Sequence, residues 1–194
     1  MRKLSLPLDE MTVRGLELGE PVALDGLIYT ARDAAHRFLA GPGGDGLGAM
    51  LRGGVIYHCG PVMVKDGGAW RVTAAGPTPS MREEPYMAGI IARYGIRAVI
   101  GKGGMGARTA EALMAHGCVY LHAVGGAAQV LASCVKSVPS VSMYEEFGAP
   151  EAVWCLEVRD FPAIVTMDCK GRSLHRTVLE NSGRRLAELL GTGL

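Results

Sequence analysis

Three basic side chains stand beside predicted turns and helix starts, where a bound anion would stabilise them. Arg32 lies in YTARDAAHRFL (29–39), Arg82 in AGPTPSMR (75–82), and Lys102 with Gly103 in IGKGGM (100–105). The last segment is a glycine loop between a predicted strand and a predicted helix, so its backbone N–H groups can face a ligand. A cation at a helix N-terminus opposes the helix dipole by about 0.3–1 kcal/mol, which an anion would offset. Two arginine forks and a lysine suit a small dianion, although each could also be an ordinary solvated side chain.

Two further residues are candidates for proton transfer. His36 follows Arg32 by four positions and Asp33 by three, so the three can share a helix face. Asp33 is then expected to fix the tautomer of the imidazole and to raise its basicity. Thr78 stands between two prolines, on a stiff turn that would present its hydroxyl. The alternatives are a surface Asp–His pair and a threonine that bonds only its own turn. His58 and His122, flanked by apolar residues, are expected to be core histidines.

Composition narrows the class of protein. The 194 residues are 48% hydrophobic, and 20 basic against 19 acidic residues give a net charge of +1. This composition excludes a disordered chain, and the charge gives no footprint for nucleic acid or an anionic membrane. With no signal peptide and no apolar run long enough for a membrane helix, we expect a soluble cytoplasmic protein. The five cysteines share no CxxC spacing, so we expect reduced thiols and no metal bound by this chain alone.

The elements that must position these residues alternate between strand and helix. Short apolar runs bounded by glycine predict strands, and apolar residues at helical spacing predict helices. Thr30 and Asp33 fit a capping pattern that would start a helix at Ala31, and 41–48 reads as a flexible insert. We therefore predict one α/β domain over 1–194 with a mixed sheet. The predicted strands lie within 21–30, 53–64, 69–77, 96–104, 118–126 and 153–168, and the predicted helices span 31–39, 87–94, 107–116, 127–135 and 179–190.

Six segments in this order resemble the β subunit, or C-terminal domain, of class I iron–sulfur hydro-lyases, a family that includes fumarate hydratase and L(+)-tartrate dehydratase. The resemblance implies a swivelling β/β/α domain that closes over a site built mainly by a partner. The segments cover most of residues 20–170 and are YTARDAAHRFL (29–39), GGVIYHCGPV (53–62), AGPTPSMR (75–82), IGKGGM (100–105), HAVGGAA (122–128) and DFPAIVTMD (160–168).

The resemblance also implies a division of labour. An α subunit would hold a [4Fe–4S] cluster through three cysteines of its own, in a heteromer of two α and two β subunits or larger. By position, Arg32, Arg82 and Lys102 would grip the substrate carboxylates, and His36 and Thr78 would serve proton transfer. Two positions depart from the family pattern. Pro79 replaces a threonine that the family commonly repeats, and Glu83 is unusual after the arginine.

The sequence thus predicts the β subunit of a fumarate hydratase, a hydro-lyase active only with its α subunit. Tartrate dehydration and mesaconate hydration stay open, because the same clamp fits any small dicarboxylate. A non-catalytic dicarboxylate-binding or assembly module is the alternative from another class.

Overall fold

A computed structural model describes residues 1–191, so the last three residues of the expected 1–194 domain lie outside the described residues. Its main sheet mixes parallel and antiparallel strands in the order β1-β2-β3-β6-β7-β9-β8. The predicted mixed α/β architecture is therefore confirmed. The strands are β1 (Arg2–Ser5), β2 (Pro21–Thr30), β3 (Val55–Tyr57), β6 (Ala98–Gly101), β7 (Val119–His122), β8 (Val135–Ser142) and β9 (Val153–Met167).

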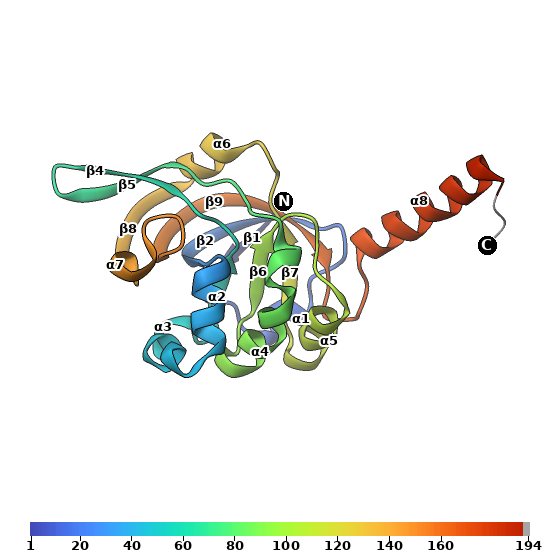
Figure 1. Cartoon of the computed structure of the whole chain (residues 1–194), viewed down its shortest axis with the longest axis horizontal. Coiled ribbons are helices and arrows are strands. Elements are labelled where there is room, and N and C mark those ends of the chain that lie inside the picture. The colour runs from blue at the N-terminus through green and yellow to red at the C-terminus, as the bar shows by residue number, and fades with distance from the viewer. Residues whose placement is uncertain (192–194) are drawn as a thin grey trace.

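The sheet closes into a barrel-like ring because the long strand β9 pairs on both sides. One edge of β9 runs antiparallel to β2, where Leu24 pairs with Phe161. Its C-terminal part runs antiparallel to β7, where Leu121 pairs with Val165. Between these edges β2, β3, β6 and β7 are parallel neighbours. Figure 1 shows β9 arching over the other strands.

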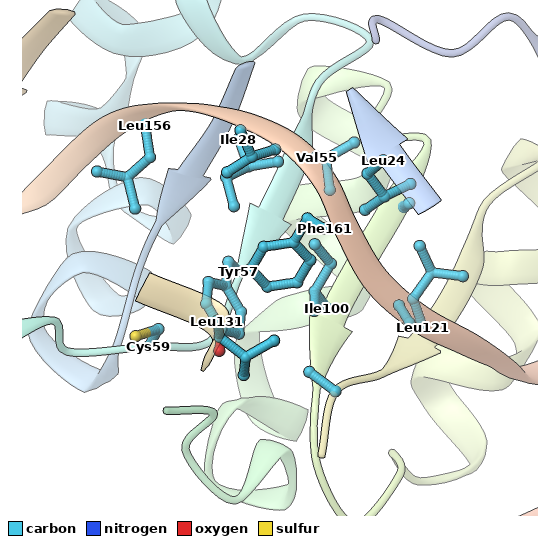
Figure 2. Close-up of a cluster of buried hydrophobic side chains, with 14 of the residues drawn as sticks. Leu24, Ile28, Val55, Tyr57, Cys59, Ile100, Leu121, Leu131, Leu156 and Phe161 are labelled. Atoms are coloured by element: carbon cyan, nitrogen blue, oxygen red, sulfur yellow. The ribbon is translucent and has the colours of Figure 1, made fainter. Parts of the chain in front are cut away.

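Alternation along the parallel strands divides the core into two layers. Tyr57 and Ile100 point into the ring, where they pack around Phe161 (Figure 2). Their neighbours Ile56 and Val99 point outward and pack under helices. Successive side chains of a strand face opposite sides, so each short strand supplies both layers. The strands are apolar throughout because both of their faces are buried.

Helices α2, α4 and α5 cover the outer face of the parallel strands (Figure 1). α5 has the predicted bounds, and α4 carries its proline in the first turn as expected. The helices are α1 (Glu10–Arg14), α2 (Asp33–Ala40), α3 (Gly48–Leu51), α4 (Glu84–Tyr94), α5 (Ala107–His116), α6 (Ala128–Ser133), α7 (Tyr144–Phe147) and α8 (Leu174–Leu190), with 3-10 turns η1 (Pro42–Leu47) and η2 (Ser80–Glu83).

The predicted start of α2 is wrong. The helix begins at Asp33 rather than Ala31, and Arg32 occupies its N-cap position without a side-chain cap. Thr30 ends β2 instead, where its hydroxyl donates to the carbonyl of Ala152 (3.3 Å) and accepts from the N–H of Trp154 (3.0 Å). A buried hydroxyl needs a hydrogen-bond partner, and the nearest one here is the main chain at the start of β9. The Thr30 hydroxyl therefore does not cap α2.

The single strand predicted within 53–64 is also wrong, because the chain leaves the ring after β3 and forms the separate strand β4 (Val62–Asp66) in a two-stranded sheet. The other differences lie outside the ring. The apolar pattern of 127–135 predicts one buried helix. In the structure α6 ends at Ser133 and Val130 is exposed, and strand β8 follows. The 41–48 insert contains η1. β4 (Val62–Asp66) and β5 (Ala69–Ala74) form a hairpin that projects from the body, and α8 projects on the opposite side (Figure 1). Among residues 1–191, no helix is both long and apolar enough to cross a membrane.

Candidate functional site

The candidate residues gather at the carboxyl ends of the parallel strands. Arg32 lies two positions after β2, His58 directly after β3, and Lys102 directly after β6. Ligands of parallel α/β sheets bind at this edge, because the chain leaves the sheet there and its loops converge. Residues 70 positions apart in sequence, such as Arg32 and Lys102, therefore share one end of the ring.

The segment after β5 brings Thr78 and Arg82 to the same edge. Pro77 forms a β-bridge with Cys59, and the N–H of Thr78 donates to the carbonyl of His58 (2.7 Å). Two residues later the N–H of Ser80 donates to the carbonyl of Lys102 (3.0 Å). These main-chain bonds hold Thr78 between the ends of β3 and β6, beside the glycine loop.

Both arginines are already paired with carboxylates. Arg82 grips Asp33 with two guanidinium nitrogens, and its Nε lies 3.1 Å from Asp33 Oδ1. Arg32 Nε lies 3.4 Å from Glu151 Oε1, and the other oxygen of Glu151 accepts the N–H of Ala34 (2.9 Å). Arg32 lies against Gly60, where a Cβ would stand 2.7 Å from the arginine Cδ. The Arg82 fork is thus oriented by hydrogen bonds before any ligand arrives, whereas the buried Arg32 Nε has an ion-pair neighbour but no hydrogen-bond partner among the described residues.

The expected pairing of Asp33 with His36 is wrong. Asp33 turns to Arg82, and His36 Nδ1 lies 2.9 Å from the carbonyl of Arg32 instead. A carbonyl can only accept, so Nδ1 carries the hydrogen and Nε2 presents a lone pair. The arginine attracts the carboxylate because its planar fork matches both oxygens, which an imidazole cannot do.

His36 is a buried neutral base. Its side chain has no exposed surface, and its Nε2 has no hydrogen-bond partner among the described residues. Burial lowers the pKa of His36 to about 4, although the carbonyl of Arg32 and the charge of Asp33 oppose the shift. The imidazole is therefore uncharged near neutral pH and contacts His58 edge-on, at 4.9 Å between ring centroids.

A buried polar chain that sequence reasoning missed crosses the floor of the site. His58 Nδ1 lies 2.9 Å from the Ser80 hydroxyl, which lies 2.8 Å from the hydroxyl of Tyr120. All three side chains are buried, and Gly101 makes room for them, since a Cβ there would stand 1.9 Å from Ser80 Oγ. The sequence shows Gly101 as the first glycine of the loop, but nothing in it indicated that His58, Ser80 and Tyr120 pack beside this glycine. His58 is thus a core histidine with one bonded nitrogen, as Nε2 has no partner among the described residues.

The glycine loop holds the remaining cation. Lys102 is half-buried, and the lysine ion pairs among residues 1–191 involve Lys3 and Lys170 instead. Gly103 is exposed and has φ of +83°, a left-handed conformation that favours glycine. Glu84 of α4 closes the loop by accepting the N–H of Gly106 (2.7 Å), as an N-cap for α5 would. The loop is therefore fixed at both ends, with the lysine beside the site.

No three His, Cys, Asp or Glu side chains gather as a metal site within residues 1–191. All five cysteines are free thiols, and Cys59, Cys118, Cys155 and Cys169 are buried. The residues of this chain do not fit an iron–sulfur cluster, so no chemistry of such a group is assigned to them.

The chain is similar in sequence to known hydratases and dehydratases. The family model described as fumarase C-terminus matches residues 2–178. A protein of Geobacillus stearothermophilus named as a fumarate hydratase class I is 50% identical over 186 residues, which are 95% of this chain and 35% of that protein. One of Methanocaldococcus jannaschii, named as an L(+)-tartrate dehydratase subunit beta, is 40% identical over 95% of this chain and 96% of its own length.

The L(+)-tartrate dehydratase subunit beta of Escherichia coli K12 is 33% identical over 88% of this chain and 85% of its own. The chain thus spans about a third of the first relative, at 35%, and most of the other two. The matched range includes Arg32, Arg82 and Lys102, the candidate residues at the sheet edge. The chain belongs to the fumarase C-terminal family.

Proposed function

We propose that this chain is the β subunit of a heteromeric class I fumarate hydratase, which interconverts fumarate and (S)-malate. The observation that carries the proposal is the convergence of Arg32, Arg82 and Lys102 at the carboxyl edge of the parallel strands. Three cations on separate elements match the two carboxylates of a small dianion better than they match a single anion. The family relatives named above support a hydro-lyase over a non-catalytic module.

In this proposal the arginines bind carboxylates and Lys102 stabilises developing charge. Asp33 and Glu151 orient the forks, so little side-chain entropy is lost when the substrate binds. Removal of a proton next to a carboxylate places negative charge on that carboxylate, and a fixed ammonium or guanidinium stabilises it most in the transition state. The chain therefore binds the substrate and lowers the barrier with the same three residues.

We assign the proton transfer to Thr78 and a supporting role to His36. Thr78 is half-buried and its main chain lies beside Lys102, through Ser80. An ordinary hydroxyl is a poor base, and nearby cations are what would favour its alkoxide. His36 has no exposed atom with which to touch a substrate, and it holds the N-terminus of α2 through Arg32.

The second part of the enzyme is the α subunit, which we propose carries the [4Fe–4S] cluster. The α subunit would dock in a groove of this chain, between α8 and the body. The groove has a volume of about 820 Å³ and is lined by Met105, Leu174, Val178 and Leu179 among others. The groove also contains Met81 and Gly103, the neighbours of Arg82 and Lys102, so its occupant would reach the substrate site. We propose that in the Geobacillus relative, of which this domain matches 35%, the rest of the same chain supplies such an occupant.

The apolar side of α8 extends this surface. No residue of α8 is buried, and Val178, Leu179, Leu186 and Leu189 are exposed. An unpartnered apolar stripe of this size marks an interface. We propose a cytoplasmic heteromer of two α and two β subunits in which α8 lies against the α subunit.

A tartrate dehydratase β subunit is the second candidate. The observation that favours it is length, because this chain matches 96% of the Methanocaldococcus relative but 35% of the Geobacillus one. The same clamp would hold tartrate, which is also a four-carbon dicarboxylate.

An anaerobic hydratase assay tests both candidates. The chain would be assayed alone and mixed with its α subunit after cluster reconstitution, with fumarate, L(+)-tartrate and mesaconate in parallel. Turnover of fumarate by the mixture, and not by either subunit, is expected. Turnover of tartrate alone would favour the second candidate, and a loaded complex that converts none of the three would contradict the hydro-lyase proposal.

A further inference from the structure

Glu83 is a buried carboxyl group directly behind the clamp. It ends η2, next to Arg82, and its side chain has no exposed surface. Neither carboxyl oxygen has a hydrogen-bond partner among the described residues. A carboxylate in such a place is costly, because buried charges need a paired cation or several donors.

Among the described residues, neither of the nearby arginines forms an ion pair with Glu83, although Arg32 Nε has no hydrogen-bond partner. Arg82, on the same turn, is held by Asp33 at the start of α2. Arg32, which precedes α2, faces Glu151 from the turn before β9. Each arginine thus already has its own carboxylate. Asp33 and Glu151 also repel a charge on Glu83, since like charges in one site disfavour ionisation.

His36 does not supply the missing charge, although its Nδ1 lies 3.3 Å from Glu83 Oε2. Its Nδ1–H donates to the carbonyl of Arg32 (2.9 Å). A second proton on Nε2 would lack an acceptor among the described residues, and the neighbouring His58 is itself buried and neutral. The contact therefore joins two neutral groups. In agreement, burial and the charges of Asp33 and Glu151 raise the pKa of Glu83 to about 7, and the charges of Arg82 and Arg32 oppose the shift.

We propose that Glu83 is a positioning residue that must hold its proton for the clamp to bind a dicarboxylate well. The proposal rests on the proposed function of the clamp. With Glu83 protonated, the three clamp cations exceed the charges of Asp33 and Glu151 by one, and a dianion is attracted. Ionised Glu83 cancels this excess charge. Because it is next to Arg82 in the chain, it also competes with the substrate carboxylate for the Arg82 guanidinium. The substrate in turn disfavours ionisation, so binding takes up a proton where Glu83 is partly ionised.

The pH dependence of substrate affinity tests this. In the reconstituted heteromer, KM for fumarate is expected to rise between about pH 7 and pH 9, by up to about tenfold per pH unit, because only the protonated fraction binds well. Glu83→Gln copies the neutral acid, so its KM should stay low and flat over the same range. Glu146→Gln removes an exposed carboxylate of α7 and should keep the wild-type profile. A Glu83→Gln enzyme whose KM still rises like wild type would overturn the proposal.

A titration of the chain itself separates this proposal from the enzyme assignment. With carboxyl-¹³C glutamate, NMR of the wild-type chain should show one carboxyl carbon that titrates near pH 7 and disappears in Glu83→Gln. If no glutamate carboxyl carbon titrates near pH 7, the proposal is wrong whatever the enzyme does. If instead the shifted carbon is present but no dicarboxylate is converted, the proton on Glu83 stands. The proposed function, and with it the role in substrate binding, is then refuted.

Discussion

Gly101→Ala should destabilise the protein far more than an added methyl group usually does. The new Cβ would stand 1.9 Å from Ser80 Oγ and 2.9 Å from the hydroxyl of Tyr120, so Ser80 must move. That movement breaks the bonds from Ser80 to His58 (2.9 Å) and Tyr120 (2.8 Å). Overpacking costs about 1–3 kcal/mol, and each buried group left unpaired costs about the same. We expect a loss of about 3–5 kcal/mol in the free energy of unfolding.

Urea unfolding followed by circular dichroism measures this loss, with the midpoint and slope fitted together. Gly89→Ala is the matched control, because a Cβ there meets nothing within 4 Å and α4 should gain about 0.5–1 kcal/mol. The pair Gly101→Ala and Ser80→Ala provides a second check. Ser80→Ala removes the oxygen that clashes, so the double variant should lose less than the sum of the single losses, by about 1 kcal/mol or more. Additive losses would refute the steric argument.

The remaining predictions concern pH, the clamp and the interface. Burial lowers the pKa of His36 to about 4, so its contribution to stability is complete above pH 6.5 and is lost on acidification. The gap in unfolding free energy between wild type and His36→Gln should therefore shift by about 3 kcal/mol between pH 6.5 and pH 4, and a constant gap would contradict the neutral assignment. Glu83 acts with the opposite sign, because its raised pKa makes stability fall as pH rises from about 4.3 to about 7. Lys102→Ala should lower kcat/KM of the heteromer by about 100-fold, and near-normal kinetics would exclude a carboxylate clamp there. Arg82→Lys should restore little of the activity lost in Arg82→Ala, because the fork is gone, and full rescue would mean that charge alone matters. Leu186→Asp on the exposed side of α8 should weaken association with the α subunit in sedimentation without changing the melting temperature of this chain, and unchanged association would place the interface elsewhere.

The sequence by itself determined the position of most strands of the ring, most helices and the glycine loop. Alternation, Pro85 in the first turn of α4 and Gly117 after α5 act within a few residues of the chain. Local sterics and local hydrophobic patterning decide such features, so they can be read without the fold. The candidate clamp residues were also proposed this way, because a cation at a predicted helix start is locally unfavourable.

Tertiary structure alone decided which side chains pair and which groups are buried. The Thr30 hydroxyl forms hydrogen bonds with the chain at β9, more than 120 positions away in sequence. Asp33 accepts hydrogen bonds from Arg82, 49 positions away, and not from His36. The bounds of β8 likewise depend on β9, with which it pairs. The sequence marked Glu83 only as unusual after the arginine and gave no sign that its side chain is completely buried. Hydrogen bonds and burial link residues that are distant in the chain, and the free energy of a polar group depends on those partners rather than on its sequence neighbours.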